Sequence, residues 1–152
     1  MMPAAKHLDP VVGVDVHIIM IPTPGGPIPT PIPHPFVGIV MDMFDYLPVV
    51  GSTVLINNIH RAQAGTEAKA VPPHIPMGGP FGPPPPGNEG EMFMGSSTVL
   101  ADGEPLTYTA LPVLTCQAIG SIAPIRPGKQ KKTTSMVLPT TVVLPIPMGA
   151  PV

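Results

Sequence analysis

Prolines stand at nearly every second position between residues 21 and 36, and this proline ladder constrains the fold of the chain more than any other feature. Its prolines are Pro22, Pro24, Pro27, Pro29, Pro31, Pro33 and Pro35. Proline lacks the backbone N–H that a helix needs, and it pushes the preceding residue into an extended conformation. The ladder therefore predicts a stiff, extended stretch with one turn at Gly25-Gly26. It also excludes a membrane-spanning helix from the most apolar part of the chain, residues 17–44.

The composition favours a folded, helix-poor domain over a disordered chain. The 152 residues include 26 Pro and 16 Gly, a share that often accompanies disorder. Disorder, however, goes with low hydrophobicity and high net charge, whereas 43% of these residues are hydrophobic and the net charge is −2. We therefore predict one mainly β domain over residues 1–152, with at most one short helix at residues 37–48. A disordered proline-rich linker that binds partners is the alternative.

A repeated segment predicts β-hairpins. Residues 51–58 (GSTVLINN) recur at residues 95–103 (GSSTVLADG), and a weaker echo lies at residues 135–143. The two clear copies end in Asn57-Asn58 and Asp102-Gly103, dipeptides that tolerate the positive φ angles of tight hairpins. Repeated units of this kind bury one another's faces. The repeat therefore predicts a small structure of hairpin units joined by Pro/Gly-rich loops.

The charge pattern and the chain ends narrow the classes of function. A net charge of −2 leaves no electrostatic footprint for nucleic acid, and we interpret the basic cluster at residues 129–132 as a solvated loop. Residues 1–10 lack the apolar region of a secretory signal peptide. We expect no nucleic-acid partner and no signal peptide. The apolar end at residues 144–152 is interpreted as a cut within a longer polypeptide.

Four of the six histidine and cysteine residues follow turns or prolines in comparable places. They are His17, His34, His74 and Cys116. Three imidazoles and one thiolate make a closed tetrahedral set, which is typical of a structural zinc site. A metal would also stabilise a chain in which only 4% of residues are aromatic. The spacing contains no paired ligand motif, so loop histidines and a buried cysteine are the alternative. We expect His60 to be a strand residue and His7 to be exposed.

The sequence offers little support for catalysis. Its aspartates show no pairing typical of a general acid and base, no glycine-rich phosphate loop follows a strand, and no Ser-His-Asp arrangement stands out. A closed zinc site would leave no position for a reacting water. We therefore predict that the protein is not an enzyme. The alternative is a small zinc metalloenzyme with an open three-histidine site, in which Cys116 is a nucleophile or a buried bystander.

Taken in order, these motifs resemble those of PAAR-domain proteins, which are named for a proline-alanine-alanine-arginine motif. Residues 2–10 (MPAAKHLDP) are similar to the start of such a domain, with Lys6 in place of the arginine and Leu8-Asp9 in place of the usual Gly-Asp. The repeated Ser-Thr-Val-Leu strand resembles the repeated hairpin of the family. Residues 33–38 (PHPFVG) and 143–149 (VLPIPMG) resemble the longer variety found at the N-terminus of Rhs (rearrangement hotspot) toxins.

The resemblance implies a pointed β-cone that caps the trimeric valine-glycine-repeat spike of a bacterial type VI secretion system. It implies zinc near the tip, held by His17, His34, His74 and Cys116, with His60 as the substitute for His34. The partners would be the spike trimer, which meets threefold-related apolar strand faces at the base, and an effector or toxin fused after Val152. The protein would reside in the bacterial cytoplasm before firing and then pass into the target cell.

Overall fold

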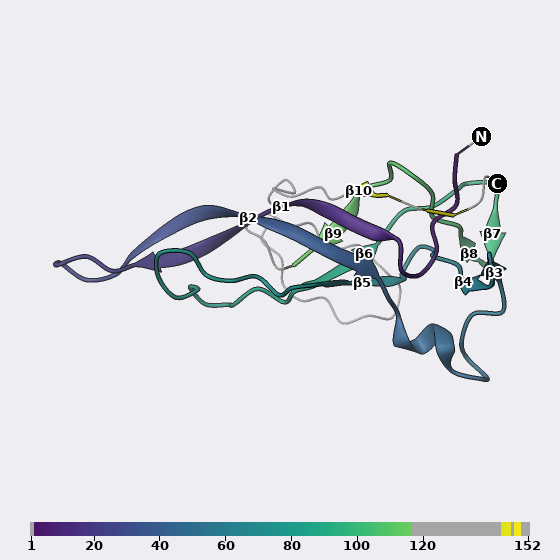
Figure 1. Cartoon of the computed structure of the whole chain (residues 1–152), viewed down its shortest axis with the longest axis horizontal. Helices are drawn as coiled ribbons and strands as arrows, with labels where there is room; N and C mark the ends of the chain where they lie inside the picture. The colour runs from purple at the N-terminus through teal and green to yellow at the C-terminus, as the bar shows by residue number, and fades with distance from the viewer. Residues whose placement is uncertain (1, 117–143, 147, 150–152) are drawn as a thin grey trace.

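The computed structural model describes residues 2–116, 144–146 and 148–149, and this part of the chain is mainly β, as predicted. The sequence echo at residues 135–143 and the basic cluster at residues 129–132 lie outside it. The main sheet has the strand order β10-β1-β2-β5-β6-β9. Its strands are β1 (Pro10–Ile21), β2 (Ile28–Val40), β5 (Glu67–Ala70), β6 (Glu89–Met92), β9 (Val113–Thr115) and β10 (Leu144–Pro145). The molecule tapers from a broad base to a narrow tip formed by β1 and β2 (Figure 1).

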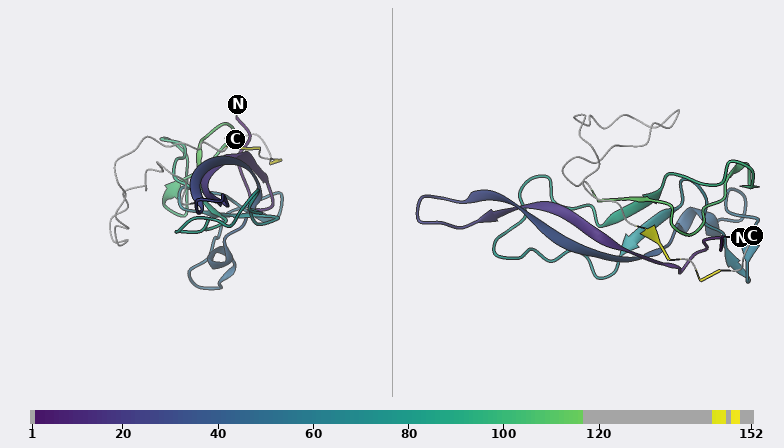
Figure 2. Two further views of the ribbon diagram at one scale, coloured as in Figure 1. Left: turned by 90° about the vertical axis from the view of Figure 1, so that its left-hand side faces the viewer. Right: turned by 90° about the horizontal axis from the view of Figure 1, so that it is seen from above.

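The proline ladder forms most of β2 and pairs with β1 in one long antiparallel hairpin. The pairing runs from Pro10 opposite Ile39 to Ile21 opposite Ile28. The predicted turn at Gly25-Gly26 is confirmed, and Gly26 has the positive φ of 112° that favours glycine. The strand at residues 11–20 and the extended ladder were both predicted, whereas their pairing with each other was not. The twisted hairpin extends beyond the rest of the molecule (Figure 2).

The prolines of β2 remove hydrogen-bond donors from one edge of this hairpin. In an antiparallel pair, alternate residues direct their N–H and C=O groups away from the partner strand. Pro29, Pro31, Pro33 and Pro35 occupy these outward positions, so this edge keeps its carbonyl acceptors and lacks N–H donors. The opposite edge is covered, because the residue 80–82 loop bonds to β1 through Met20 N to Pro80 O (2.8 Å) and Gly82 N to Ile18 O (2.8 Å). Both edges of the tip are therefore protected from pairing with another strand.

A small apolar core packs against the half of the β1–β2 hairpin that is nearer the base. Its larger members are Val11, Phe36, Val40, Met92 and Val113, all at most 1% exposed, and alanines fill the space between them. Within the described residues this core buries little apolar surface, so its packing supplies limited stability. Within the part of the chain that the structure describes, no helix is long and apolar enough to cross a membrane.

A ring of three backbone hydrogen bonds closes the base. The amide of Ala5 donates to Thr107 O (2.9 Å), that of Thr107 to Ala62 O (3.0 Å), and that of Ala62 to Ala5 O (2.9 Å). Three residues after each member, the chain adopts a positive φ, at Leu8 (68°), Gly65 (101°) and Ala110 (70°). Three separate segments of one chain therefore follow the same path around a common axis. The base has an approximate threefold arrangement.

Two short hairpins flank this ring and confirm the prediction made from the repeat. They are β3 (Leu55–Ile56) with β4 (Ile59–His60), and β7 (Leu100–Ala101) with β8 (Glu104–Pro105). Their turns lie at the predicted dipeptides, where Asn57, Asn58, Asp102 and Gly103 all have positive φ angles of 52–86°. Turn residues that tolerate this conformation therefore set the register of both units.

The segment after β2 forms one 3₁₀ turn, η1 (Met43–Tyr46), instead of a longer helix. Residues 37–40 of the predicted helical region belong to β2, and Asp42 caps the turn by accepting from Phe44 N (2.9 Å). Pairing of β2 with β1 and β5 holds residues 37–40 extended and overrides their local pattern. A single short helical element therefore agrees with the predicted fold class.

The expectation that His7 is exposed is wrong, because its side chain is completely buried. Its Nε2 lies 2.9 Å from Asp45 Oδ2 and its Nδ1 lies 3.2 Å from the Tyr46 hydroxyl. Arg61, 2% exposed, joins the cluster by ion pairs to Asp45 (2.8 Å) and Asp102 (3.0 Å). The polar N-terminal segment was expected to be solvated, but the backbone hydrogen bonds of Ala5 to Ala62 and Thr107 place this segment in the base. The cluster ties η1 to that base.

The proline edge yields a first prediction. Replacing Pro29, Pro31 and Pro33 together by threonine restores three outward N–H donors on a strand that threonine suits. We expect this variant to self-associate with increasing concentration, as measured by sedimentation velocity, while the parent protein does not. Pro85→Thr, in a loop away from the strands, is the control. A triple variant that sediments like the parent protein at all concentrations would contradict the edge argument.

The buried His7 yields a second prediction. Burial lowers the pKa of His7 below 6.5, and the hydrogen bond to Asp45 offsets only part of that shift. Below pH 6.5 the unfolded chain therefore binds a proton that the folded protein does not, so the free energy of unfolding falls as the pH falls. The slope from this residue is at most about 1.4 kcal/mol per pH unit. His7→Gln should show a smaller slope than the parent protein between pH 7 and 5 in urea titrations. Equal slopes would contradict the assignment.

Candidate metal centre

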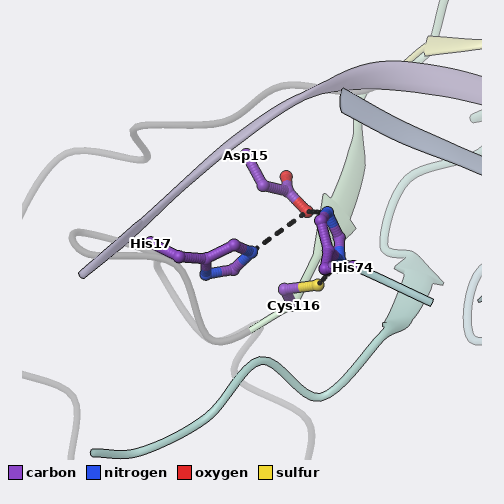
Figure 3. Close-up of side chains that lie close together, drawn as sticks. All are labelled: Asp15, His17, His74 and Cys116. Atoms are coloured by element: carbon purple, nitrogen blue, oxygen red, sulfur yellow. Dashed lines mark hydrogen bonds and ion pairs between the residues drawn. The ribbon is translucent and has the colours of Figure 1, made fainter. Parts of the chain in front are cut away.

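Four segments that are distant in sequence bring ligand-type side chains together where the hairpin meets the body. Asp15 and His17 come from β1, His34 from β2, His74 from the residue 71–88 segment, and Cys116 directly follows β9. One ligand atom from each of Asp15, His17, His74 and Cys116 lies within 4.8 Å of the others. Figure 3 shows the carboxylate between the two imidazoles, with the thiol below. These four side chains are called the donor group below.

The structure brings three of the four predicted ligands into the donor group and places the fourth beside it. His17, His74 and Cys116 are members. His34 is 1% exposed, and its ring centroid lies 5.5 Å from that of His17 and 6.0 Å from that of His74. His60 lies in the His7 cluster at the base, with its ring centroid 4.4 Å from that of Tyr46. The neighbour of the donor group is therefore His34 and not its suggested substitute.

Asp15 is the member that the sequence analysis missed. Residues i and i+2 of a strand point to the same face, and the alternating burial of β1 places Asp15 on the interior face with His17. In the hairpin register Asp15 lies directly opposite His34. The spacing Asp-x-His within a strand was a signal that could have identified Asp15. Its significance depended on the pairing of β1 with β2, which the sequence did not reveal.

Hydrogen bonds at Nδ1 hold two of the imidazoles in place. His74 Nδ1 donates to Asn88 Oδ1 (2.9 Å), which also accepts from the His74 backbone amide (2.7 Å). His34 Nδ1 donates to Ile32 O (2.9 Å). Since a neutral imidazole has one N–H, each ring keeps a lone pair on Nε2. An outer partner of this kind holds a metal-binding histidine in the required tautomer.

The site contains buried polar atoms that the described residues leave without a hydrogen bond. They are Asp15 Oδ2, His17 Nε2, His34 Nε2 and His74 Nε2. The carboxylate oxygen lies 3.5 Å from His74 Nε2 and 4.0 Å from His17 Nε2. Buried polar groups without partners are costly. A cation at the centre of the donor group would satisfy the three of these atoms that belong to Asp15, His17 and His74, so the donor set fits a metal ion.

The local environment shifts the pKa of two members. Burial, with the neighbouring His74 ring, lowers the pKa of His17 to about 4. Burial, with the negative charge of Asp15, raises the pKa of the Cys116 thiol to about 12. Without a metal the imidazole is therefore neutral and the thiol keeps its proton at pH 7. A coordinating metal deprotonates a thiol, so Cys116 is unreactive alone and becomes a ligand only with a metal.

Removal of the thiol yields a third prediction. Cys116→Ala should lower zinc affinity by more than about 100-fold, since even outer-sphere partners typically contribute 10–100-fold. The melting temperature of the zinc-loaded protein should fall with it, because the binding energy of a structural metal is folding energy. His60→Gln is the control and should keep one zinc per chain by metal analysis. A Cys116→Ala variant that retains its zinc and its melting temperature would remove Cys116 from the ligand set.

Comparison of this chain with protein-family models, with curated proteins and with solved structures gives no match.

Proposed function

We propose that this protein is the structural tip of a bacterial type VI secretion spike, which caps a trimeric valine-glycine-repeat protein and carries an attached effector. The observation that supports this most is the ring at the base. Three residues that are far apart in the sequence, Ala5, Ala62 and Thr107, form a closed cycle of backbone hydrogen bonds. A single chain with an approximate threefold end is suited to a partner with threefold symmetry.

The base also offers apolar side chains for such a contact. Leu8 is 51% exposed and follows one segment of the ring, while Leu55 (51%) and Leu100 (61%) occupy equivalent positions in the two short hairpins. These hairpins lie at the end of the molecule opposite the tip (Figure 1). Exposed apolar groups of this kind mark protein interfaces. A spike trimer would cover them.

The metal centre supports a mechanical role for the opposite end. A structural zinc ion held by the donor group, with His34 beside it, would join β1, the residue 71–88 segment and the end of β9. Its chemistry would be that of a cross-link, with no position left for a reacting water. The tip hairpin is further stiffened by the fixed φ angles of its prolines. Rigidity of this kind suits a part that must withstand force.

The same geometry gives less support to a metalloenzyme with an open three-histidine site. The Cys116 sulfur belongs to the donor group, 3.6 Å from His74 Nδ1, so the thiol is a ligand candidate and not a bystander. Asp15 is completely buried and His17 is 4% exposed, which leaves little access for a substrate. We therefore propose a non-enzymatic protein, present in the bacterial cytoplasm before firing and delivered with its fused cargo into the target cell.

Binding to the spike yields a fourth prediction. The zinc-loaded protein, mixed with the trimeric spike protein of the same bacterium, should form a complex of one chain per trimer by native mass spectrometry. Leu55→Glu with Leu100→Glu should weaken this complex by at least about 100-fold, because two charges would be buried in an apolar contact. The control is Ile75→Glu, a residue 71% exposed in the segment beside the hairpin, which should bind as the parent does. Absence of any complex at micromolar concentrations would contradict the proposed function.

A further inference from the structure

The buried carboxylate of Asp15 has one oxygen, Oδ2, that the described residues leave without a hydrogen bond. Asp15 is completely buried, and among the described residues its ion-pair partners are the rings of His17 and His74 alone. The Thr115 hydroxyl donates to its Oδ1. Its Oδ2 receives no hydrogen bond within the described part of the chain. A carboxylate in such a place is costly unless a cation lies against Oδ2.

The neutral ring of His74 cannot donate a proton to Asp15 Oδ2 without losing its hydrogen bond to Asn88. Asn88 Oδ1 accepts from His74 Nδ1, so the neutral ring presents a lone pair at Nε2. This lone pair and Asp15 Oδ2 lie 3.5 Å apart, and His17 Nε2 lies 4.0 Å from the same oxygen (Figure 3). Lone pairs directed at one another repel. An ion placed among the three atoms converts this repulsion into coordination.

The net charge of the metal site also favours Asp15 as a ligand. A divalent metal with one thiolate, from Cys116, and neutral imidazoles leaves a net charge of +1 in a buried site. The Asp15 carboxylate brings that charge to zero. His34 cannot do so, since its Nδ1–H is held by Ile32 O and the ring is neutral when its Nε2 carries a lone pair. His34 also lies outside the group of atoms that are mutually within 4.8 Å.

We propose that Asp15 coordinates the metal through Oδ2, in the place that the family resemblance gives to His34, and that its charge makes the site selective for divalent over monovalent ions. The ligand set is then Asp15, His17, His74 and Cys116, with two anionic members. Imidazole and thiolate alone would also suit a soft monovalent ion such as Cu⁺. The carboxylate adds a hard oxygen and a second negative charge, both of which favour Zn²⁺. This inference rests on the structural metal of the proposed function but not on the spike.

One isosteric variant of Asp15 and one truncating variant of His34 distinguish these two candidate ligands. Zinc affinity is measured by competition with a chromophoric chelator for Asp15→Asn, His34→Ala and the control Glu89→Gln, whose carboxylate is exposed on neighbouring β6. We expect Asp15→Asn to lose at least about 100-fold, His34→Ala less than about 10-fold, and the control nothing. Cu⁺ affinity, measured anaerobically in the same way, should change in Asp15→Asn by less than about 10-fold. A loss in His34→Ala that equals or exceeds the loss in Asp15→Asn would overturn the proposal.

A measurement on the unmodified protein covers the case in which Asp15→Asn does not fold. In a crystal of the zinc-loaded protein, anomalous scattering at the zinc edge locates the ion. We expect Asp15 Oδ2 at about 2.0–2.2 Å from it. A zinc ion bonded to His34 Nε2, with Oδ2 beyond about 3 Å, would overturn the proposal while leaving the structural metal intact. A parent protein that binds no zinc would instead remove the metal from the proposed function as well.

Discussion

The long pairing of β1 with β2 is the interaction on which the rest of the structure depends. It runs without interruption from Pro10 opposite Ile39 to Ile21 opposite Ile28. Its period of two sorts the residues into an interior face, which carries Asp15, His17 and His34, and an outward face. It also sends the proline nitrogens of β2 to the free edge. One register therefore creates the face that carries the candidate metal ligands and the protected edge together, and a slip by one residue would destroy both.

A metal ion at the donor group would compensate for what this architecture lacks. The core is small, and several of its buried positions are alanines such as Ala62 and Ala68, which bury little surface. The hairpin projects from that core with few large residues beneath it. A cluster of donors at the junction, held by Asn88, Ile32 O and Thr115, places a strong interaction where packing is weakest. Structural metals serve small domains in this way, because their binding energy adds directly to folding energy.

Features set by local chemistry could be predicted from the sequence. The turns at Asn57-Asn58 and Asp102-Gly103 were correct because few dipeptides tolerate positive φ. The extended ladder was correct because proline fixes its own φ. The structure places His17, His74 and Cys116 close together, while zinc and its exact ligands stay proposals.

Features set by long-range pairing could not be predicted. The burial of His7 and the membership of Asp15 both follow from partners far along the chain. The ring of Ala5, Ala62 and Thr107 is made by backbone atoms, which leave no side-chain pattern in a sequence. The types of side chain were therefore enough to predict the turns and the candidate ligands. They could not predict the closure of the base, because backbone atoms make those contacts.

The ring at the base has a consequence for orientation. If this chain binds the end of a threefold partner, as proposed, it can dock in three rotational settings that the symmetry of the partner makes equal in energy. That degeneracy favours binding by RT ln 3, about 0.65 kcal/mol. Among the described residues η1 is the single 3₁₀ turn, and the contacts of His7 with Asp45 and Tyr46 hold it to one side of the base. A cap of this kind would therefore make a nearly threefold contact with its partner while carrying one asymmetric projection, η1. In different complexes that projection would point in any of three directions.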